Sequence, residues 1–153
     1  MTPSRLELKI PPPLVLLTSA GLHTFLVSWF PAIGIETPLI LSFACVLLAL
    51  FFGFSGVFLC WRKKTTIHPW DPTDTTALVT DGVFAVSRNP MYFGLLLLLS
   101  GWVLQPLHPA SLLALMIFFL YINRFQIAPE ERILAAKFGD HYSAYCDRVR
   151  RWI

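Results

Sequence analysis

Two long stretches of the chain are almost free of charged side chains. Between Ile10 and Trp61 the only Asp, Glu, Lys or Arg is Glu36, and from Asn89 to Asn123 there is none. A helix that crosses a bilayer needs about 20 consecutive apolar residues, so each stretch is long enough for two crossings. The pattern predicts an all-α integral membrane protein.

Each stretch is interrupted by a short segment that breaks helices. The segments 31–38 and 105–109 hold two prolines each, and the first also holds a glycine, which is typical of turns. We therefore expect four transmembrane helices in two hairpins, at about 12–30, 38–60, 91–104 and 110–126. The third is short, so we expect it to be tilted or to begin at the membrane interface.

The basic residues predict the orientation of these spans. All twelve Lys and Arg residues lie in the N-terminal arm, in the loop 61–90 or in the C-terminal segment that begins at Arg124. With four spans these three regions share one side, and the positive-inside rule places that side in the cytoplasm. We expect one domain, 1–153, with a cytoplasmic tail 127–153 and both termini in the cytoplasm. Such a compact chain with short loops is typical of a bacterial inner-membrane protein.

Composition narrows the class of protein further. Hydrophobic residues make up 56% of the chain and charged residues 14%, against about a quarter charged in a soluble domain. This excludes a disordered tail, a charged binding module and an ordinary cytosolic enzyme. The net charge of +3 fits a basic rim at an anionic leaflet and requires no nucleic-acid partner. The first apolar run is too long for a signal peptide and lacks its cleavage site.

The sequence contains no pattern typical of a metal or redox site. The spacing of the three cysteines gives neither a metal knuckle nor a redox pair, and no Gly-rich phosphate loop or nucleophile elbow is present. Apart from Arg124 near the end of the fourth, no Asp, Glu, Lys or Arg falls inside the expected spans, which disfavours an ion-coupled transporter. His23 lies in the first span, where it is either functional or a neutral side chain bonded to a neighbouring helix. The Gly53–Gly56 face predicts close helix packing, within the chain or between copies.

Arg88 and Asn89 precede the expected third helix, with Pro90 at its first position. Free main-chain N–H groups and a guanidinium at such a helix start suit a carboxylate or a phosphate. Taken alone, Arg88 is more often a topology anchor, and Tyr92 more often an aromatic residue of the membrane interface.

A pair of acidic residues follows the last expected span. Pro129 is expected to open a cytoplasmic helix, with Glu130 and Glu131 in its first turn and Gly139 at its end. The two carboxylates either only stabilise the helix dipole or accept hydrogen bonds from ribose hydroxyls or a cationic group. The remaining tail is amphipathic, and we expect it to lie on the membrane surface or to fold over the loop.

Taken together, these motifs resemble the isoprenylcysteine carboxyl methyltransferase-like family of membrane methyltransferases, which is related to the phospholipid N-methyltransferases. The resemblance covers roughly residues 65–152. It rests on Gly82 and Phe84, on Arg88-Asn89-Pro90-Met91-Tyr92-Phe93-Gly94, and, after one hairpin, on Pro129-Glu130-Glu131 and Phe138-Gly139-Asp140-His141-Tyr142-Ser143-Ala144-Tyr145.

The resemblance implies a cytoplasmic site for S-adenosylmethionine and for no metal. It assigns Arg88 and Asn89 to the amino-acid end of this cofactor, and Glu130 and Glu131 to its ribose or ammonium group. Residues expected along the adenine or the acceptor are Tyr92, Tyr142 and His68, and those expected to be catalytic are Arg88 and Glu131. Asn89 replaces the usual histidine of the family; it keeps a hydrogen-bond donor and acceptor but cannot take up a proton.

The function implied by the resemblance is methyl transfer from S-adenosylmethionine to a lipophilic acceptor, which is a carboxylate, a thiol or an amine. Two alternatives remain. Asn89 favours a non-catalytic membrane scaffold or assembly protein that kept the fold. A nicotinamide-dependent membrane reductase is the other, although this chain is much shorter than such enzymes. The oligomeric state stays open.

Overall fold

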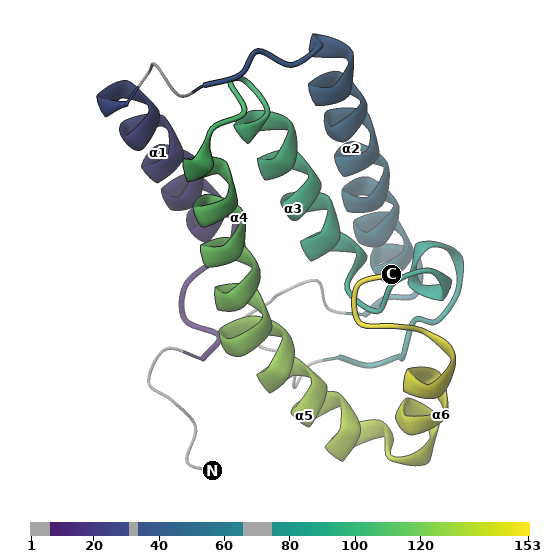
Figure 1. Cartoon of the computed structure of the whole chain (residues 1–153). Helices are drawn as coiled ribbons and strands as arrows, with labels where there is room; N and C mark the ends of the chain where they lie inside the picture. Colours follow the sequence, from purple (N-terminus) through teal and green to yellow (C-terminus); the bar gives the residue numbers. More distant parts are fainter. Residues whose placement is uncertain (1–6, 31–33, 66–74) are drawn as a thin grey trace.

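The computed structural model describes residues 7–30, 34–65 and 75–153, and this part of the chain is helical, with no strand. Four helices form a bundle in which α3 lies between α2 on one side and α1 and α4 on the other (Figure 1). Their bounds are α1 Pro12–Trp29, α2 Leu39–Arg62, α3 Pro90–Val103 and α4 Pro109–Ile122. Beyond the bundle lie the short 3-10 helix η3 Gly82–Ala85, α5 Ala128–Phe138 and α6 Asp140–Arg148.

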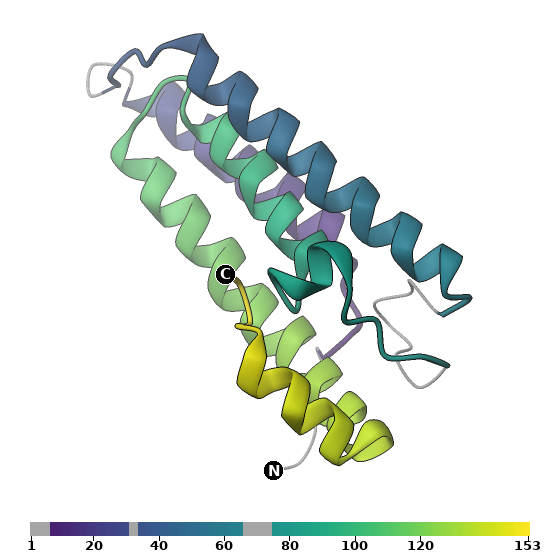
Figure 2. The same ribbon diagram turned by 90° about the vertical axis from the view of Figure 1, so that its right-hand side faces the viewer.

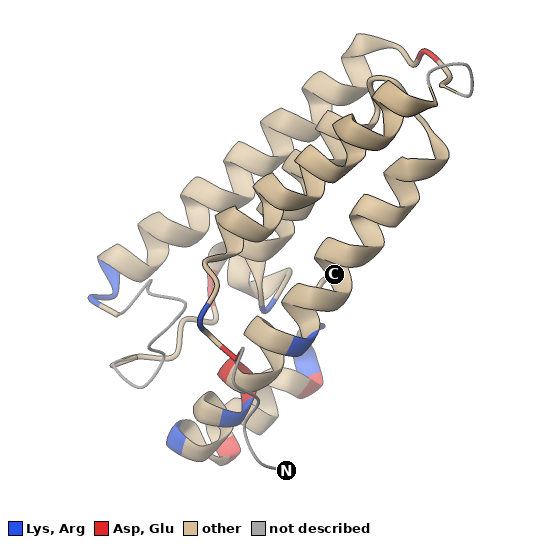
Figure 3. Cartoon of the chain, turned by 90° about the vertical axis from the view of Figure 1, so that its left-hand side faces the viewer, with Lys and Arg blue, Asp and Glu red and all other residues tan. Residues whose placement is uncertain are grey.

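The two connecting turns lie against each other at one end of the bundle. Ile35 and Leu107 exchange main-chain hydrogen bonds of 2.8 and 3.0 Å, and the Gln105 side chain donates to the Thr37 carbonyl at 2.8 Å. The charged residues of the described chain gather at the opposite end (Figure 3). The exception is Glu36, in the segment between α1 and α2. We call the end where Lys and Arg gather the charged end.

Two helices are long and apolar enough to cross a membrane: α2, and the continuous helix Pro109–Phe138. Helix α2 also exposes large apolar side chains, with Phe54 and Trp61 each 70% accessible. Such an apolar surface on one helix is unfavourable in water and suits contact with lipid. Helix α3 has 14 residues, so it is only about 21 Å long and shorter than the hydrocarbon core of a bilayer.

Glycines allow α2 and α3 to approach closely, as the sequence predicted. A Cβ at Gly94 would lie 2.9 Å from the Ala49 carbonyl oxygen and 3.2 Å from the Gly53 nitrogen. A Cβ at Gly56 would lie 2.8 Å from Cγ of Met91. Small residues are what permit such backbone contact between apolar helices. The Gly53–Gly56 face is therefore used within the chain.

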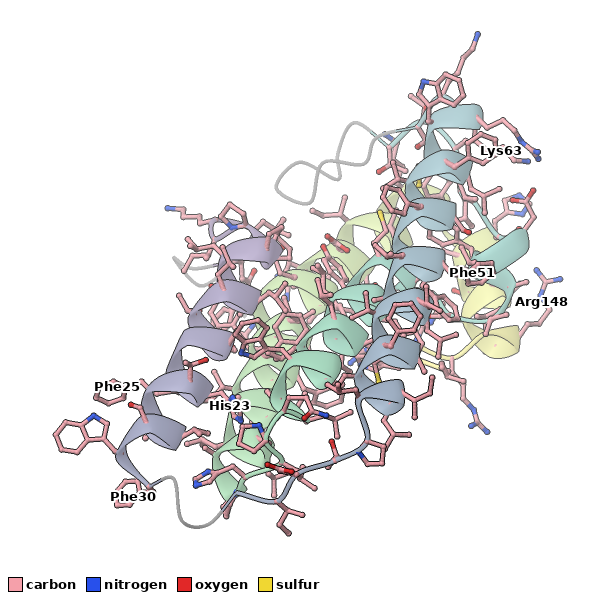
Figure 4. All side chains as sticks on the ribbon, turned by 90° about the horizontal axis from the view of Figure 1, so that it is seen from above. His23, Phe25, Phe30, Phe51, Lys63 and Arg148 are labelled. Atoms are coloured by element: carbon pink, nitrogen blue, oxygen red, sulfur yellow. The ribbon has the colours of Figure 1, made fainter. Side chains whose placement is uncertain are left out.

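His23 bonds to a neighbouring helix, which is one of the two explanations that the sequence allowed. Its Nε2 lies 3.1 Å from Oγ of Ser111 on α4, and both side chains are buried. Ser111 in turn donates to the Val103 carbonyl at 2.8 Å. Figure 4 shows His23 pointing into the bundle, whereas Phe25 and Phe30 of the same region point away from it. The histidine thus fixes α1 against α4 near the two turns.

Pro129 lies in the first turn of α5, as expected, but no break separates α5 from α4. Helix α4 continues without interruption to Phe138, and residues Asn123–Ile127 form a π-helical turn, η4. Proline lacks the N–H that would bond to the carbonyl four residues earlier, here that of Phe125. The N-terminal arm supplies the missing donor, because the Leu8 N–H bonds to the Phe125 carbonyl at 2.9 Å. A wider π turn together with this bond lets the helix pass through the proline and carry Glu130 and Glu131 beyond the bundle.

Helix α6 folds back over the loop, which is one of the two placements that the sequence predicted for the C-terminal tail (Figure 2). Gly139 ends α5 with a φ of 50°, a left-handed conformation that favours glycine. Helix α6 then packs Tyr142 and Tyr145 against Leu78 and Leu134. The Tyr145 hydroxyl donates to the Phe84 carbonyl of η3 at 2.6 Å.

Replacing Tyr145 by phenylalanine is expected to lower the free energy of unfolding by about 1 kcal/mol, because it leaves the buried Phe84 carbonyl without this donor. Unfolding of detergent-purified protein followed by circular dichroism measures the change. Tyr121→Phe is the matched control, since the buried Tyr121 hydroxyl has no hydrogen-bond partner in the described structure. Equal stability of the two variants would show that the bond to Phe84 contributes nothing.

Candidate active site

A cavity of about 690 Å³ lies at the charged end of the bundle. Its apolar wall includes Gly53, Phe54 and Val57 of α2 and Leu95 and Leu98 of α3. Its polar wall includes Arg88, Asn89, Tyr92, Glu130, Glu131 and Tyr142. This volume is in the range of small-molecule and cofactor sites. The cavity therefore joins the apolar helices α2 and α3 to a compact group of polar side chains.

The structure brings together the residues that the sequence selected from three separate segments. Arg88 and Asn89 come just before α3, Tyr92 lies in its first turn, Glu130 and Glu131 lie in the first turn of α5, and Tyr142 lies in α6. All six line the same cavity. The remaining candidate, His68, lies outside the described residues. The assignment of these side chains to particular groups of a cofactor stays a prediction.

Glu131 is held between two guanidinium groups. Its Oε1 lies 3.3 Å from Nη1 of Arg88. Arg151 pairs with both carboxylate oxygens, through Nε to Oε1 at 3.0 Å and through Nη2 to Oε2 at 2.5 Å. Such a two-pronged pair fixes the orientation of the carboxylate as well as its charge. The hydrogen bonds to Glu131 raise the pKa of Arg151.

Arg88 has capacity left for a ligand. Nη1 also donates to Sγ of Cys146, while Nε is buried and has no hydrogen-bond partner in the described structure. A buried donor without a partner is costly, and an anionic group in the cavity would satisfy it. With two arginines and one glutamate, the cluster Arg88–Glu131–Arg151 carries a formal charge of +1. It is suited to attract a carboxylate.

Glu130 occupies a different environment from Glu131. The Tyr92 hydroxyl donates a hydrogen bond to Oε1 of Glu130, and Tyr92 is buried at the start of α3. The two adjacent glutamates therefore have different partners, a tyrosine for one and two arginines for the other. Burial raises the pKa of Glu130 to about 8, and its side-chain oxygens can still accept hydrogen bonds from hydroxyl or ammonium groups.

Tyr142 stays protonated at neutral pH. Burial raises its pKa, and the nearby Glu131 carboxylate raises it further, since both disfavour a phenolate. Arg88 acts in the opposite direction with a smaller effect. Tyr142 can therefore donate a hydrogen bond to a ligand in the cavity, or pack its ring against one.

Asn89 is partly engaged by the C-terminal segment of the chain. Its Nδ2 donates to the Arg151 carbonyl at 2.9 Å, and its main-chain N–H bonds to Oγ of Ser87 at 3.1 Å. The amide therefore helps to hold the segment that carries Arg151. The side-chain carbonyl is the part of Asn89 left to contact a ligand.

Arg151 and Cys146 were missed from the sequence, although Arg151 contacts the expected site residue Glu131 and Cys146 contacts the expected site residue Arg88. Their positions in the sequence give no motif with Arg88, and only the return of α6 brings them close. The run Arg150-Arg151-Trp152 was an available signal, because basic and aromatic residues together are typical of a membrane interface. No group of three potential metal ligands occurs in the part of the chain that the structure describes.

Comparisons with known proteins identify the family to which the chain is similar. The family model described as phospholipid methyltransferase matches residues 37–141, which include Arg88, Tyr92, Glu130 and Glu131. A protein of Haemophilus influenzae that is described as uncharacterized is 49% identical over 63 residues, or 41% of this chain and the whole of that relative. No solved structure matches the chain. The family match confirms the resemblance to membrane methyltransferases that the motifs indicated.

Proposed function

The chain belongs to the phospholipid methyltransferase family of membrane methyltransferases, and we propose that it transfers a methyl group from S-adenosylmethionine to a lipophilic acceptor. The acceptor carries a carboxylate, a thiol or an amine as the methylated group. The reaction takes place at the charged end of the bundle, where the cavity lies.

One observation carries this proposal: a single cavity is apolar along α2 and α3 and polar where Arg88, Glu130 and Glu131 meet. A polar cofactor and an apolar acceptor need such a shared space. The wall formed by α2 belongs to a helix with large exposed apolar side chains, which suits an acceptor that arrives from the lipid phase. The polar wall lies beside the loop and the C-terminal helices, which suits a cofactor that arrives from water.

The residues present fit S-adenosylmethionine, which when bound supplies an electrophilic methyl group on a positively charged sulfur. Arg88, with its unpartnered Nε, is suited to bind the carboxylate of the methionine part. Glu130 is suited to the ribose hydroxyls or the ammonium group, and Tyr142 to the adenine or the acceptor. The contribution of these side chains is to orient the two reactants and to exclude water, which favours a direct displacement.

The proposal includes a membrane topology. All four bundle helices cross the bilayer, with α3 short and the two contacting turns outside the cell membrane. The loop 61–90, the N-terminal arm and α5 and α6 then lie in the cytoplasm, with the charged end at the inner surface of a bacterial membrane. Support comes from the location of every described Lys and Arg at that end (Figure 3).

Calorimetry on detergent-purified protein tests the function. We expect S-adenosylmethionine to bind and NADPH not to bind. Binding of NADPH alone would replace the proposal by a nicotinamide-dependent reductase, and binding of neither would favour a non-catalytic scaffold. If S-adenosylmethionine binds, incubation of the protein and the methyl-labelled cofactor with lipid extracts identifies the acceptor by transfer of the label.

A further inference from the structure

The last five residues, 149–153, turn back from α6 and cross the start of α3; we call them the C-terminal strap. The Arg88 N–H bonds to the Arg150 carbonyl at 3.0 Å. The Arg151 carbonyl accepts from Nδ2 of Asn89 at 2.9 Å and from Oγ of Ser87 at 3.4 Å. The strap is therefore tied to Ser87 and to Arg88 and Asn89, the first two residues of the predicted cofactor motif.

The far end of the strap is fixed on the continuous helix Pro109–Phe138. The indole N–H of Trp152 donates to Oδ1 of Asn123 at 3.2 Å, and its ring stacks on Phe119 of α4 with ring centres 5.1 Å apart. Nη1 of Arg151 lies 3.4 Å from the same Asn123 oxygen. Both ends of the strap are thus held, and the backbone of Arg151 has little freedom to move.

The side chain of Arg151 reaches from this fixed backbone to Glu131. It contacts both carboxylate oxygens, whereas Arg88 contacts only one of them. Without Arg151 the cluster would consist of Arg88 and Glu131 alone, with a net charge of zero instead of +1. Arg88 would then be neutralised by its own partner and less able to bind an anion.

We propose that Arg151 is a positioning residue for cofactor binding. By holding Glu131, it leaves the charge of Arg88 available for the carboxylate of the methionine part. The inference rests on the proposed function, because it assigns a second arginine to the recognition of the same cofactor. The inference goes beyond the proposed function because it assigns the selectivity of the site for an anionic ligand to the strap, which does not itself line the cavity.

The test compares two ligands in four proteins. Calorimetry measures the dissociation constants of S-adenosylmethionine and of its decarboxylated analogue for the wild type, Arg151→Gln, Arg151→Lys and Arg150→Gln. The wild type is expected to prefer the ligand with the carboxylate. Arg151→Gln should reduce this preference by about tenfold, as expected for one charge-assisted contact. Arg151→Lys keeps the charge but loses the planar fork, so its preference should lie between these two values.

Arg150→Gln is the matched control, since the Arg150 residue is exposed. The substitution keeps the main-chain carbonyl of residue 150, which accepts from the Arg88 N–H. It should keep the wild-type preference. If Arg151 has a purely structural role, its substitution would weaken the binding of both ligands equally and leave the ratio of their dissociation constants unchanged. That result would overturn the inference while the proposed function stands. Failure of the wild type to bind S-adenosylmethionine would overturn the proposed function together with the inference. If Arg151→Gln does not fold, an unchanged ratio in Arg151→Lys also overturns the inference.

Discussion

Replacing Arg88 by alanine is expected to weaken the binding of S-adenosylmethionine by about 100-fold, because one hydrogen-bonded charge contributes about 1.5–3 kcal/mol. Arg88 combines a cavity-lining position, an unpartnered buried Nε and a place beside the start of α3. Its removal also leaves Glu131 paired with Arg151 alone, so the cluster loses its positive charge. Calorimetry with detergent-purified protein measures the change.

Arg148→Ala is the control for the effect of Arg88→Ala. Arg148 lies on α6 at the same end of the molecule, and its side chain points away from the helices (Figure 4). Its removal changes the net charge of the chain by the same amount and should leave the affinity within about twofold. If Arg88→Ala folds and binds the cofactor with wild-type affinity, Arg88 has no part in the cofactor site.

Replacing Gly94 by alanine is expected to lower the free energy of unfolding by about 1–3 kcal/mol, the usual cost of overpacking. The new Cβ would meet the Ala49 carbonyl oxygen at 2.9 Å, and this obstacle is backbone that cannot rotate away. Helix α2 must move away from α3, which displaces the residues of both helices that form the apolar wall of the cavity. Thermal unfolding in detergent measures the stability, and calorimetry measures the accompanying loss of cofactor affinity.

Replacing Gly21 by alanine should have the opposite effect on the free energy of unfolding. Gly21 lies in α1, and a Cβ there meets no atom within 4 Å. Alanine restricts the unfolded chain more than glycine, so Gly21→Ala should stabilise the protein by about 0.5–1 kcal/mol. A Gly94→Ala variant as stable as Gly21→Ala would show that α2 and α3 do not need their close contact.

The hairpin pattern was predictable because each part of it depends on residues close in sequence. Pro and Gly break a helix wherever they stand in a short segment, so the turns at 31–38 and 105–109 could be located without a structure. The sequence did not indicate that α4 runs directly into α5, because a distant partner helps the helix to pass through Pro129. The Leu8 N–H comes from the opposite end of the chain, and no local rule indicates that it bonds to the Phe125 carbonyl.

The candidate site was predictable in its motifs and not in its connections. Arg88, Glu130 and Glu131 could be selected because each stands at a helix start with a known affinity for ions or dipoles. The sequence did not show which partner each glutamate contacts. Adjacent residues on a helix point in different directions, and their neighbours come from other segments of the chain. One step along α5 separates Glu130, bonded by Tyr92, from Glu131, bonded by Arg88 and Arg151.

The sequence by itself determined that this is a helical protein with apolar segments of membrane length and charges concentrated between and after them. Composition and periodicity act locally, and they are visible in the order of residues. The tertiary structure decided that α2 and α3 touch through glycine backbone, that α4 continues into α5 through Pro129, and that the strap brings Arg151 to Glu131. These contacts join residues far apart in the chain, and their geometry follows only from how the helices pack.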